Sequence, residues 1–169
     1  LSAVNVSSDN FEYKALKLDG LVPDHLMTSA RKLQDLRYGE NPHQTAALYG
    51  VDKGWGFSSA QVVQGKGLSF TNLLDLDAAA RLVLEFTEPS AVVIKHMNPS
   101  GVATGGTLCD AYVAAREVDS ISAFGGIVGL NRPLDTKTAK EITSTFIEAV
   151  VAPGASQEAL AIMASKKNL

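Results

Sequence analysis

The stretch AVVIKHMNPSG at residues 91–101 joins an apolar run directly to a polar one. Residues 91–94 are all apolar and three of them are β-branched, which predicts a short strand buried on both faces. A lysine and a histidine follow at once, so charge is expected to emerge where the strand ends. Ligands of open α/β sheets usually bind beyond the carboxyl ends of the strands. Lys95 and His96 are therefore candidates for a functional site.

The residues after this strand are expected to form a restrained polar loop. Pro99 limits the backbone of Asn98, and Gly101 is expected to relieve the turn. Two adjacent groups with different proton affinities could supply the base and the acid of one proton transfer. The alternative interpretation of Lys95 and His96 is a polar strand end that simply faces water.

Strands and helices alternate along the chain from residue 60 onward. Apolar runs bounded by turn residues predict strands, and apolar side chains at helical spacing predict helices. The expected strands cover residues 46–49, 60–64, 91–94, 126–130 and 149–152, and the expected helices cover residues 71–86, 108–118, 135–146 and 156–164. Asp135 and Ser156 are the expected N-caps of the last two helices. This order predicts an α/β layered fold with a mainly parallel sheet, preceded by an extended lead-in over residues 1–35.

Composition limits the classes of function. The chain has 169 residues, about one domain, with 46% hydrophobic and 20% charged residues and a net charge of -3. This charge does not favour general binding to nucleic acid or to an anionic membrane, and the longest apolar run is far too short to span a bilayer. Because Cys109 is the single cysteine, neither an intrachain disulfide nor a cysteine zinc cluster can form. We therefore predict no nucleic acid, membrane or metal partner.

The cellular location is predicted only loosely. A lone cysteine fits a reducing compartment, and we expect a cytoplasmic protein. The chain begins at Leu1 rather than Met and stops at Leu169. We expect both ends to be cut, so an organelle stays open as an alternative.

Two further loops carry candidate ligand-binding groups. Arg37 and Tyr38, together with His43, offer a planar cation for phosphate and two aromatic hydrogen-bonding groups. The alternative is a surface loop tethered by Arg37. In the stretch SAFGG at residues 122–126, two glycines would let the backbone approach a ligand beside the apolar wall of Phe124. The alternative is a tight turn with a core phenylalanine.

Three polar residues near the start of the helix expected at residues 71–86 have modest interpretations. Asn72 is either a ligand-binding group or the cap of that helix. Asp75 and Asp77 lie two residues apart and face different ways on a helix. We therefore interpret them as solvated or capping carboxylates and not as an acid–base pair.

The order of these segments is more specific than any one of them. The chain contains LRYGENPHQ at residues 36–44, QGKGLSFTN at 64–72, KHMNPSG at 95–101, SAFGG at 122–126 and FIEAVVAP at 146–153. Together they closely resemble the bifunctional purine-synthesis family that joins aminoimidazole carboxamide ribonucleotide formyltransferase to inosine monophosphate cyclohydrolase. The resemblance covers roughly residues 36–168.

The resemblance implies a domain organisation. The family's formyltransferase domain contains two cytidine-deaminase-like α/β subdomains, and residues 36–169 resemble the first of them. The cyclohydrolase domain would lie before Leu1 and the second subdomain after Leu169. The family builds its site at a dimer interface from both parts of the domain, so this chain is expected to hold part of a site and to form a homodimer in the intact protein.

The resemblance also implies a reaction, which is formyl transfer from 10-formyltetrahydrofolate to the 5-amino group of the nucleotide. The folate is a cosubstrate, and no tightly bound cofactor is expected. His96 corresponds to the group that manages the amine proton, and Lys95 to one that stabilises developing charge or protonates the departing folate nitrogen. The implied substrate-binding residues are Arg37, Tyr38, Asn72, Asn98, Phe124, Gly125 and Glu148.

Two other functions are compatible with parts of the pattern. A non-catalytic module that binds nucleotide or holds a dimer would have the same sequence, because the missing half would contribute site residues. A zinc deaminase would match the expected fold, but its metal site requires two or three cysteines and the chain has only Cys109.

Overall fold

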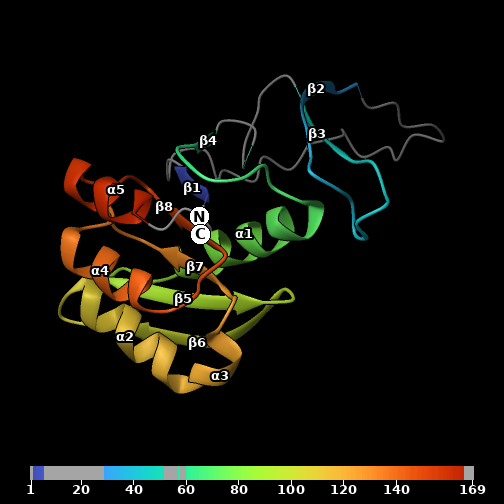
Figure 1. The fold of residues 1–169 in the computed structure, drawn as a ribbon. Helices are drawn as coiled ribbons and strands as arrows, with labels where there is room; N and C mark the ends of the chain where they lie inside the picture. The colour runs from blue at the N-terminus through green and yellow to red at the C-terminus, as the bar shows by residue number, and fades with distance from the viewer. Residues whose placement is uncertain (1, 6–28, 52–56, 58–59, 166–169) are drawn as a thin grey trace, which may run out of the picture.

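The computed structural model describes residues 2–5, 29–51, 57 and 60–165. Within these residues a six-stranded sheet has the order β4-β1-β8-β7-β5-β6 and carries helices on both faces (Figure 1). Its strands are β1 (Ser2–Asn5), β4 (Gln61–Val62), β5 (Ser90–Lys95), β6 (Asn98–Thr104), β7 (Ile127–Leu130) and β8 (Ala149–Ala152). The predicted α/β class is confirmed.

The core has two halves, one on each face of the sheet. Helix α1 (Phe70–Val83) packs on one face, and α2 (Leu108–Val118), α4 (Thr136–Ser144) and α5 (Gln157–Ala164) pack on the other (Figure 1). Side chains of β5 alternate between the halves, because Val92 and Ile94 join the cluster under α1 while Ala91 and Val93 join the cluster under α2. Burial on both faces explains why this strand is apolar throughout.

Helix ends follow the local capping signals. Ser69 is the N-cap of α1, and its hydroxyl accepts a hydrogen bond from the Asn72 backbone N–H while the Asn72 side chain accepts one from the Ser69 N–H. Asn72 is therefore the reciprocal partner of a capping box and not the cap itself. Asp135 and Ser156 are confirmed as the N-caps of α4 and α5.

The prediction of a mainly parallel sheet is wrong. Only β1–β8 and β7–β8 are parallel, whereas β1–β4, β5–β7 and β5–β6 are antiparallel. The difference comes from residues 98–104, which form strand β6, whereas the prediction was a polar loop over residues 95–101 and no strand there. Pro99 is tolerated there because β6 is an edge strand and its register with β5 shifts beside the proline.

Gly101 lies inside β6 and does not relieve a turn, contrary to expectation. A Cβ at this position would lie 1.8 Å from the carbonyl oxygen of Ala115 in α2. Glycine is required here because helix α2 crosses the strand at backbone contact distance.

We predict that Gly101→Ala lowers the free energy of unfolding by about 1–3 kcal/mol, because a methyl group would force α2 away from β6. Chemical denaturation of the chain measures this loss. Gly106→Ala is the matched control, since a Cβ there has open space around it. Equal denaturation midpoints for the two variants would contradict the close packing.

The strands before α1 belong to two different sheets. Strand β1 pairs with β8 in the main sheet, and β2 (Arg31–Asp35) pairs with β3 (Ala47–Gly50) in a separate antiparallel ribbon. The predicted strand at residues 46–49 is confirmed by β3. Residues 6–28 of the predicted lead-in lie outside the described residues, and the division of the chain at residue 35 stays a prediction. None of the helices in the described ranges has the length and apolar character needed to cross a membrane.

Candidate functional site

The β5–β6 hairpin carries the predicted Lys-His pair at its tip. Lys95 pairs with Asn98 across the strands, so His96 and Met97 are the two loop residues. Their φ angles are 52° and 62°, which matches the requirement of a type I′ turn for positive φ at both central residues. Such turns usually contain Asn-Gly, and a non-glycine residue held in this region costs about 1–3 kcal/mol. A surrounding structure must therefore hold this turn in place.

Two hydrogen bonds hold the turn. The Asn98 side-chain amide donates to the His96 carbonyl oxygen over 2.9 Å, within the hairpin. The Met97 backbone N–H donates to the Asp75 carboxylate in helix α1 over 2.7 Å. The interpretation of Asp75 as a solvated or capping group is wrong, because this carboxylate binds the turn. Its neighbour Asp77 forms an ion pair with Arg81 on the same helix over 2.8 Å.

Lys95 is oriented by a second turn, at residues 123–126. Phe124 has φ -63° and ψ 121°, Gly125 has φ 73°, and the Gly126 N–H donates to the Ala123 carbonyl oxygen over 3.0 Å. These features define a type II turn, in which the third residue requires positive φ and is usually glycine. The Lys95 ammonium donates to the Phe124 carbonyl oxygen over 2.8 Å.

The Lys95 ammonium keeps donors available for a ligand. It takes part in none of the ion pairs formed among the described residues, and an ammonium has three donors. The pKa of the Asp119 carboxyl lies below its usual value because the Ser122 side chain and N–H are hydrogen-bonded to it, and the charge of Lys95 contributes to a lesser degree. Lys95 is half-buried, and its ammonium lies beside the Phe124 turn.

Phe124 is not a core residue, which corrects one of its two interpretations. Its side chain is 61% exposed, and its ring lies 5.3 Å from the ring of Phe146. The tight turn itself was predicted correctly. An exposed aromatic pair next to a lysine offers an apolar wall to a planar ligand.

The remaining predicted groups form a polar network at the start of α1. The Asn72 side-chain amide donates to the Glu148 carboxylate over 3.0 Å, and its oxygen lies 3.5 Å from Arg37 Nη2. Arg37 Nη2 is also 3.9 Å from Glu148 Oε1 and 3.1 Å from the Tyr38 hydroxyl, and its guanidinium lies over the Tyr38 ring. Arg37 tethers its loop, as one of its two interpretations states, and its side chain is 36% exposed. Its role in binding phosphate stays a prediction.

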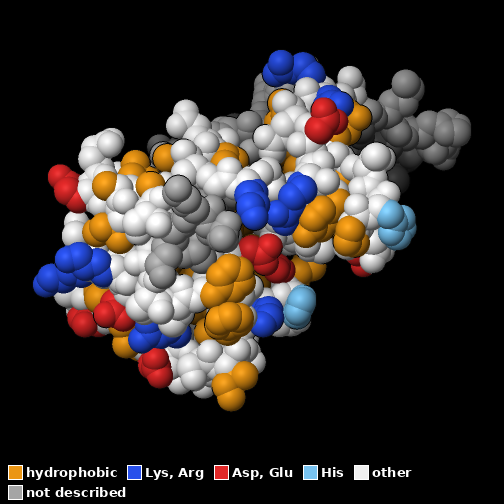
Figure 2. All heavy atoms as spheres, viewed as in Figure 1, with side chains coloured by type: hydrophobic (Ala, Val, Ile, Leu, Met, Phe, Trp, Pro, Cys, Tyr) orange, Lys and Arg blue, Asp and Glu red, His pale blue; other side chains and the backbone are white. Residues whose placement is uncertain are grey.

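Backbone hydrogen bonds place this network next to Lys95. The Gly125 N–H donates to the Phe146 carbonyl oxygen, and the Glu148 N–H donates to the Gly126 carbonyl oxygen. The segment that carries Glu148 therefore lies against the turn that binds Lys95. In keeping with these contacts, Figure 2 shows basic, acidic, hydrophobic and histidine side chains close together on one face. Five separate segments of the sequence meet at this end of the sheet.

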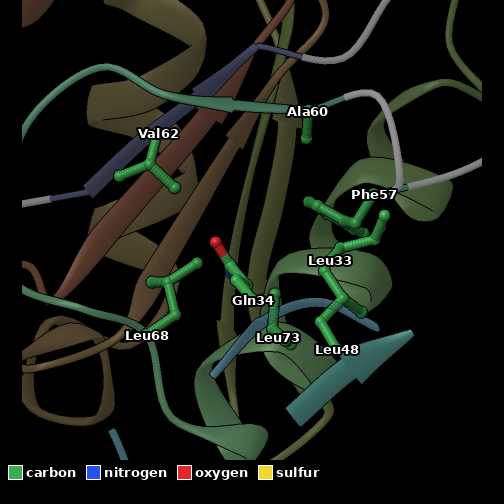
Figure 3. Close-up of a pocket in the computed structure, with 8 residues that line it drawn as sticks. All are labelled: Leu33, Gln34, Leu48, Phe57, Ala60, Val62, Leu68 and Leu73. Carbon is green, nitrogen blue, oxygen red and sulfur yellow. The ribbon is translucent and has the colours of Figure 1, made fainter. Parts of the chain in front are cut away.

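A separate cavity of about 300 Å³ lies between the β2–β3 ribbon, β4 and α1 (Figure 3). Its lining residues are Leu33, Gln34, Leu48, Phe57, Ala60, Val62, Leu68 and Leu73. Gln34 is the only polar side chain among them, so the cavity lacks the ionisable groups that acid–base chemistry requires. We therefore assign the candidate site to the polar cluster and not to this cavity.

No group of three or more histidine, cysteine, aspartate and glutamate side chains in the described part of the chain is arranged to hold a metal ion. The described carboxylates at the site, Asp75 and Glu148, instead accept hydrogen bonds from Met97 and Asn72.

The sequence model of the AICARFT/IMPCHase bienzyme matches residues 6–169. The chain belongs to this family. Among its relatives are the bifunctional purine biosynthesis proteins PurH of Cyanothece sp., 56% identical over 88% of this chain, and of Rhodospirillum rubrum, 55% identical over 87%. The PurH protein of Rhizobium leguminosarum is 47% identical over 99% of the chain. The chain spans 29%, 28% and 32% of the length of these three relatives.

Membership of the AICARFT/IMPCHase bienzyme family confirms the resemblance identified from the motifs and connects the chain with purine biosynthesis. The roles of individual site residues stay predictions. The site residues form two adjacent groups. Lys95 is bound to the Phe124 turn, and Arg37, Asn72 and Glu148 form the polar network. Asp75 is the additional residue that sequence reasoning missed, because a contact to a turn 22 residues away has no local signal.

We predict that Gly125→Ala destabilises the chain by about 1–2 kcal/mol, because an L-residue is strained at positive φ. Crowding is not the reason, since an added Cβ would lie 3.5 Å from the Phe146 ring, an ordinary contact. Gly125→Asn should cost less, because asparagine tolerates this conformation better. Thermal or chemical unfolding measures these differences, with Gly67→Ala in open space as the control. A loss equal to that of the control would contradict the type II turn.

Proposed function

We propose that this chain provides the nucleotide-binding groups and the Lys-His pair for formyl transfer from 10-formyltetrahydrofolate to the 5-amino group of aminoimidazole carboxamide ribonucleotide. The observation that carries the proposal is the junction of the Lys95–His96 hairpin with the Arg37–Asn72–Glu148 network at one end of the sheet. Family membership supports the choice of reaction.

The reaction forms a bond between the amine nitrogen and the formyl carbon and breaks the bond between that carbon and folate N10. The amine loses a proton, and N10 gains one. His96 is exposed at the hairpin tip and is proposed to accept the amine proton. Lys95 has free donor capacity and is proposed to stabilise the developing oxyanion or to protonate N10. Placing both residues at the end of one hairpin limits their relative positions, and such orientation lowers the barrier for a weak nucleophile.

The nucleotide is proposed to bind across the polar network. Arg37 offers a planar fork that matches phosphate geometry. Asn72 and Glu148 would bind polar edges of the nucleotide, and Phe124 with Gly125 would lie against its ring. Asn98 supports the turn through its bond to the His96 carbonyl oxygen. The folate is proposed as a second substrate and not as a resident cofactor.

Several of the candidate groups are open to solvent, although Asn72 is buried. The side chains of His96, Asn98, Phe124 and Glu148 are exposed. Active sites usually enclose most of their ligand, so we propose that other parts of a longer protein, or a second copy in a homodimer, cover this face. The same openness favours the second candidate function, a nucleotide-binding module without turnover of its own. Turnover by the 169-residue chain alone would exclude this second function.

We predict that Lys95→Ala or His96→Ala lowers kcat for formyl transfer by about 10²–10⁴-fold in the intact protein that carries this chain, because each removes a proton-transfer or charge-stabilising group. Nucleotide affinity should change little, since the proposed polar binding groups Arg37, Asn72 and Glu148 lie in the other network. Lys140→Ala, an exposed lysine of α4, is the control. Near-normal turnover in either variant would refute the assigned role.

We predict that Arg37→Ala weakens binding of the nucleotide about tenfold or more, because charge-assisted hydrogen bonds to phosphate are lost. Calorimetric titration with aminoimidazole carboxamide ribonucleotide measures this, with adenosine monophosphate as the control ligand. Binding of the dephosphorylated nucleoside should change much less. The exposed Arg31→Ala in β2 is the control variant. Equal losses for nucleotide and nucleoside would mean that Arg37 does not bind the phosphate.

A further inference from the structure

Helix α1 supports both halves of the candidate site through two side chains one turn apart. Asn72 donates to Glu148 in the nucleotide-binding network. Asp75, three residues later and thus on the same helix face, accepts from the Met97 N–H in the catalytic hairpin. Asn72 and Glu148 are 76 residues apart in the sequence, and Asp75 and Met97 are 22 residues apart, so one helix turn connects two distant segments.

The hairpin has little else to fix its tip. His96, Met97 and Asn98 are all exposed, and Met97 is 54% exposed although it is hydrophobic. Burial therefore does not hold the turn, and its two central residues have the strained positive φ angles. The bond from the Asn98 side chain stays within the hairpin. Among the described residues, the hydrogen bonds that tie the hairpin end to other elements are Met97 to Asp75 and Lys95 to the Phe124 carbonyl oxygen.

We infer that Asp75 is a positioning residue for the proposed formyl transfer, because it anchors the His96–Met97 turn to helix α1. Its carboxylate oxygen fixes the direction of the Met97 N–H and thereby the peptide that follows His96. The backbone of His96 is then held at a constant place relative to helix α1, which carries Asn72. The expected effect on catalysis rests on the proposed function. The anchoring of the turn by Asp75 does not depend on it.

The anchoring can be tested without any substrate. In amide-resolved NMR of the full 169-residue chain, the Met97 amide should be protected from hydrogen exchange. Asp75→Ala should raise its exchange rate about tenfold or more, because a charge-assisted hydrogen bond is lost. Asp75→Asn keeps an oxygen acceptor and should retain most of the protection. Asp77→Ala removes a carboxylate from the same helix without touching the turn and is the matched control. A Met97 amide that is unaffected by Asp75→Ala would overturn the inference.

The consequence for catalysis is tested in the intact protein that carries the chain. Asp75→Ala should lower kcat about tenfold to a hundredfold, as a misplacement near 1 Å would, while KM for the nucleotide stays within about twofold. Adding Met97→Gly to Asp75→Ala should restore part of kcat, because glycine adopts positive φ without strain. A loss that neither Asp75→Asn nor the added glycine reduces would mean a general structural defect and would overturn the positioning role.

The two experiments separate the inference from the proposed function. If the unchanged protein shows no formyl transfer, the proposed function fails, and the Met97 exchange data still decide whether Asp75 holds the turn. If transfer occurs and Asp75→Ala leaves kcat unchanged, the proposed function stands and the positioning role is refuted.

Discussion

The burial of β5 on both faces is the constraint on which the rest of this structure depends. Val92 and Ile94 are packed under α1, and Ala91 and Val93 are packed under the helices of the opposite face, all with almost no exposed surface. Lys95 comes next and cannot stay in such a core without a large desolvation cost. The chain therefore leaves the sheet within one residue of Ile94 and returns as the edge strand β6. The lysine and histidine reach solvent at the end of a rigid strand.

A rigid strand alone would not fix the histidine, because the reversal uses two non-glycine residues in a strained conformation. Such residues are retained where the surroundings over-determine them, and they are enriched at functional sites. Here the carboxylate of Asp75 and the amide of Asn98 hold the turn from two sides. The strain reduces stability, and the benefit is a histidine whose backbone has few alternative positions. An Asn-Gly pair would form the same turn with less strain, but it would provide no imidazole at the tip of the hairpin.

Helix α1 connects the two parts of the candidate site through hydrogen bonds of its Asn72 and Asp75 side chains. Its capping box uses the same Asn72 that binds Glu148, so the start of the helix and the polar network are ordered together. One turn later the helix holds the hairpin. The face that results is open, and the chain spans less than a third of the length of the relatives compared with it. An open half-site fits our proposal that the remaining walls come from other parts of a longer protein or from a partner copy.

Much of the local structure was predictable from the sequence because its causes are local. The apolar run at residues 91–94 and the caps Asp135 and Ser156 depend on neighbours within a few residues, and each formed as predicted. The motif order also identified the family and drew attention to Lys95 and His96. The family and the Lys-His pair were both found from short sequence motifs, which can be identified without the tertiary structure.

The tertiary structure alone decided the direction of β6, the reason for Gly101, the exposure of Phe124 and the contact of Asp75 with Met97. Three of these depend on an element that packs against the residue: β5 for the direction of β6, α2 for Gly101, and α1 for Met97. A His-Met pair has none of the glycine or asparagine that normally marks a type I′ turn. Nothing local therefore distinguished a hairpin from a loop, because the support that makes this turn possible comes from a helix 22 residues earlier.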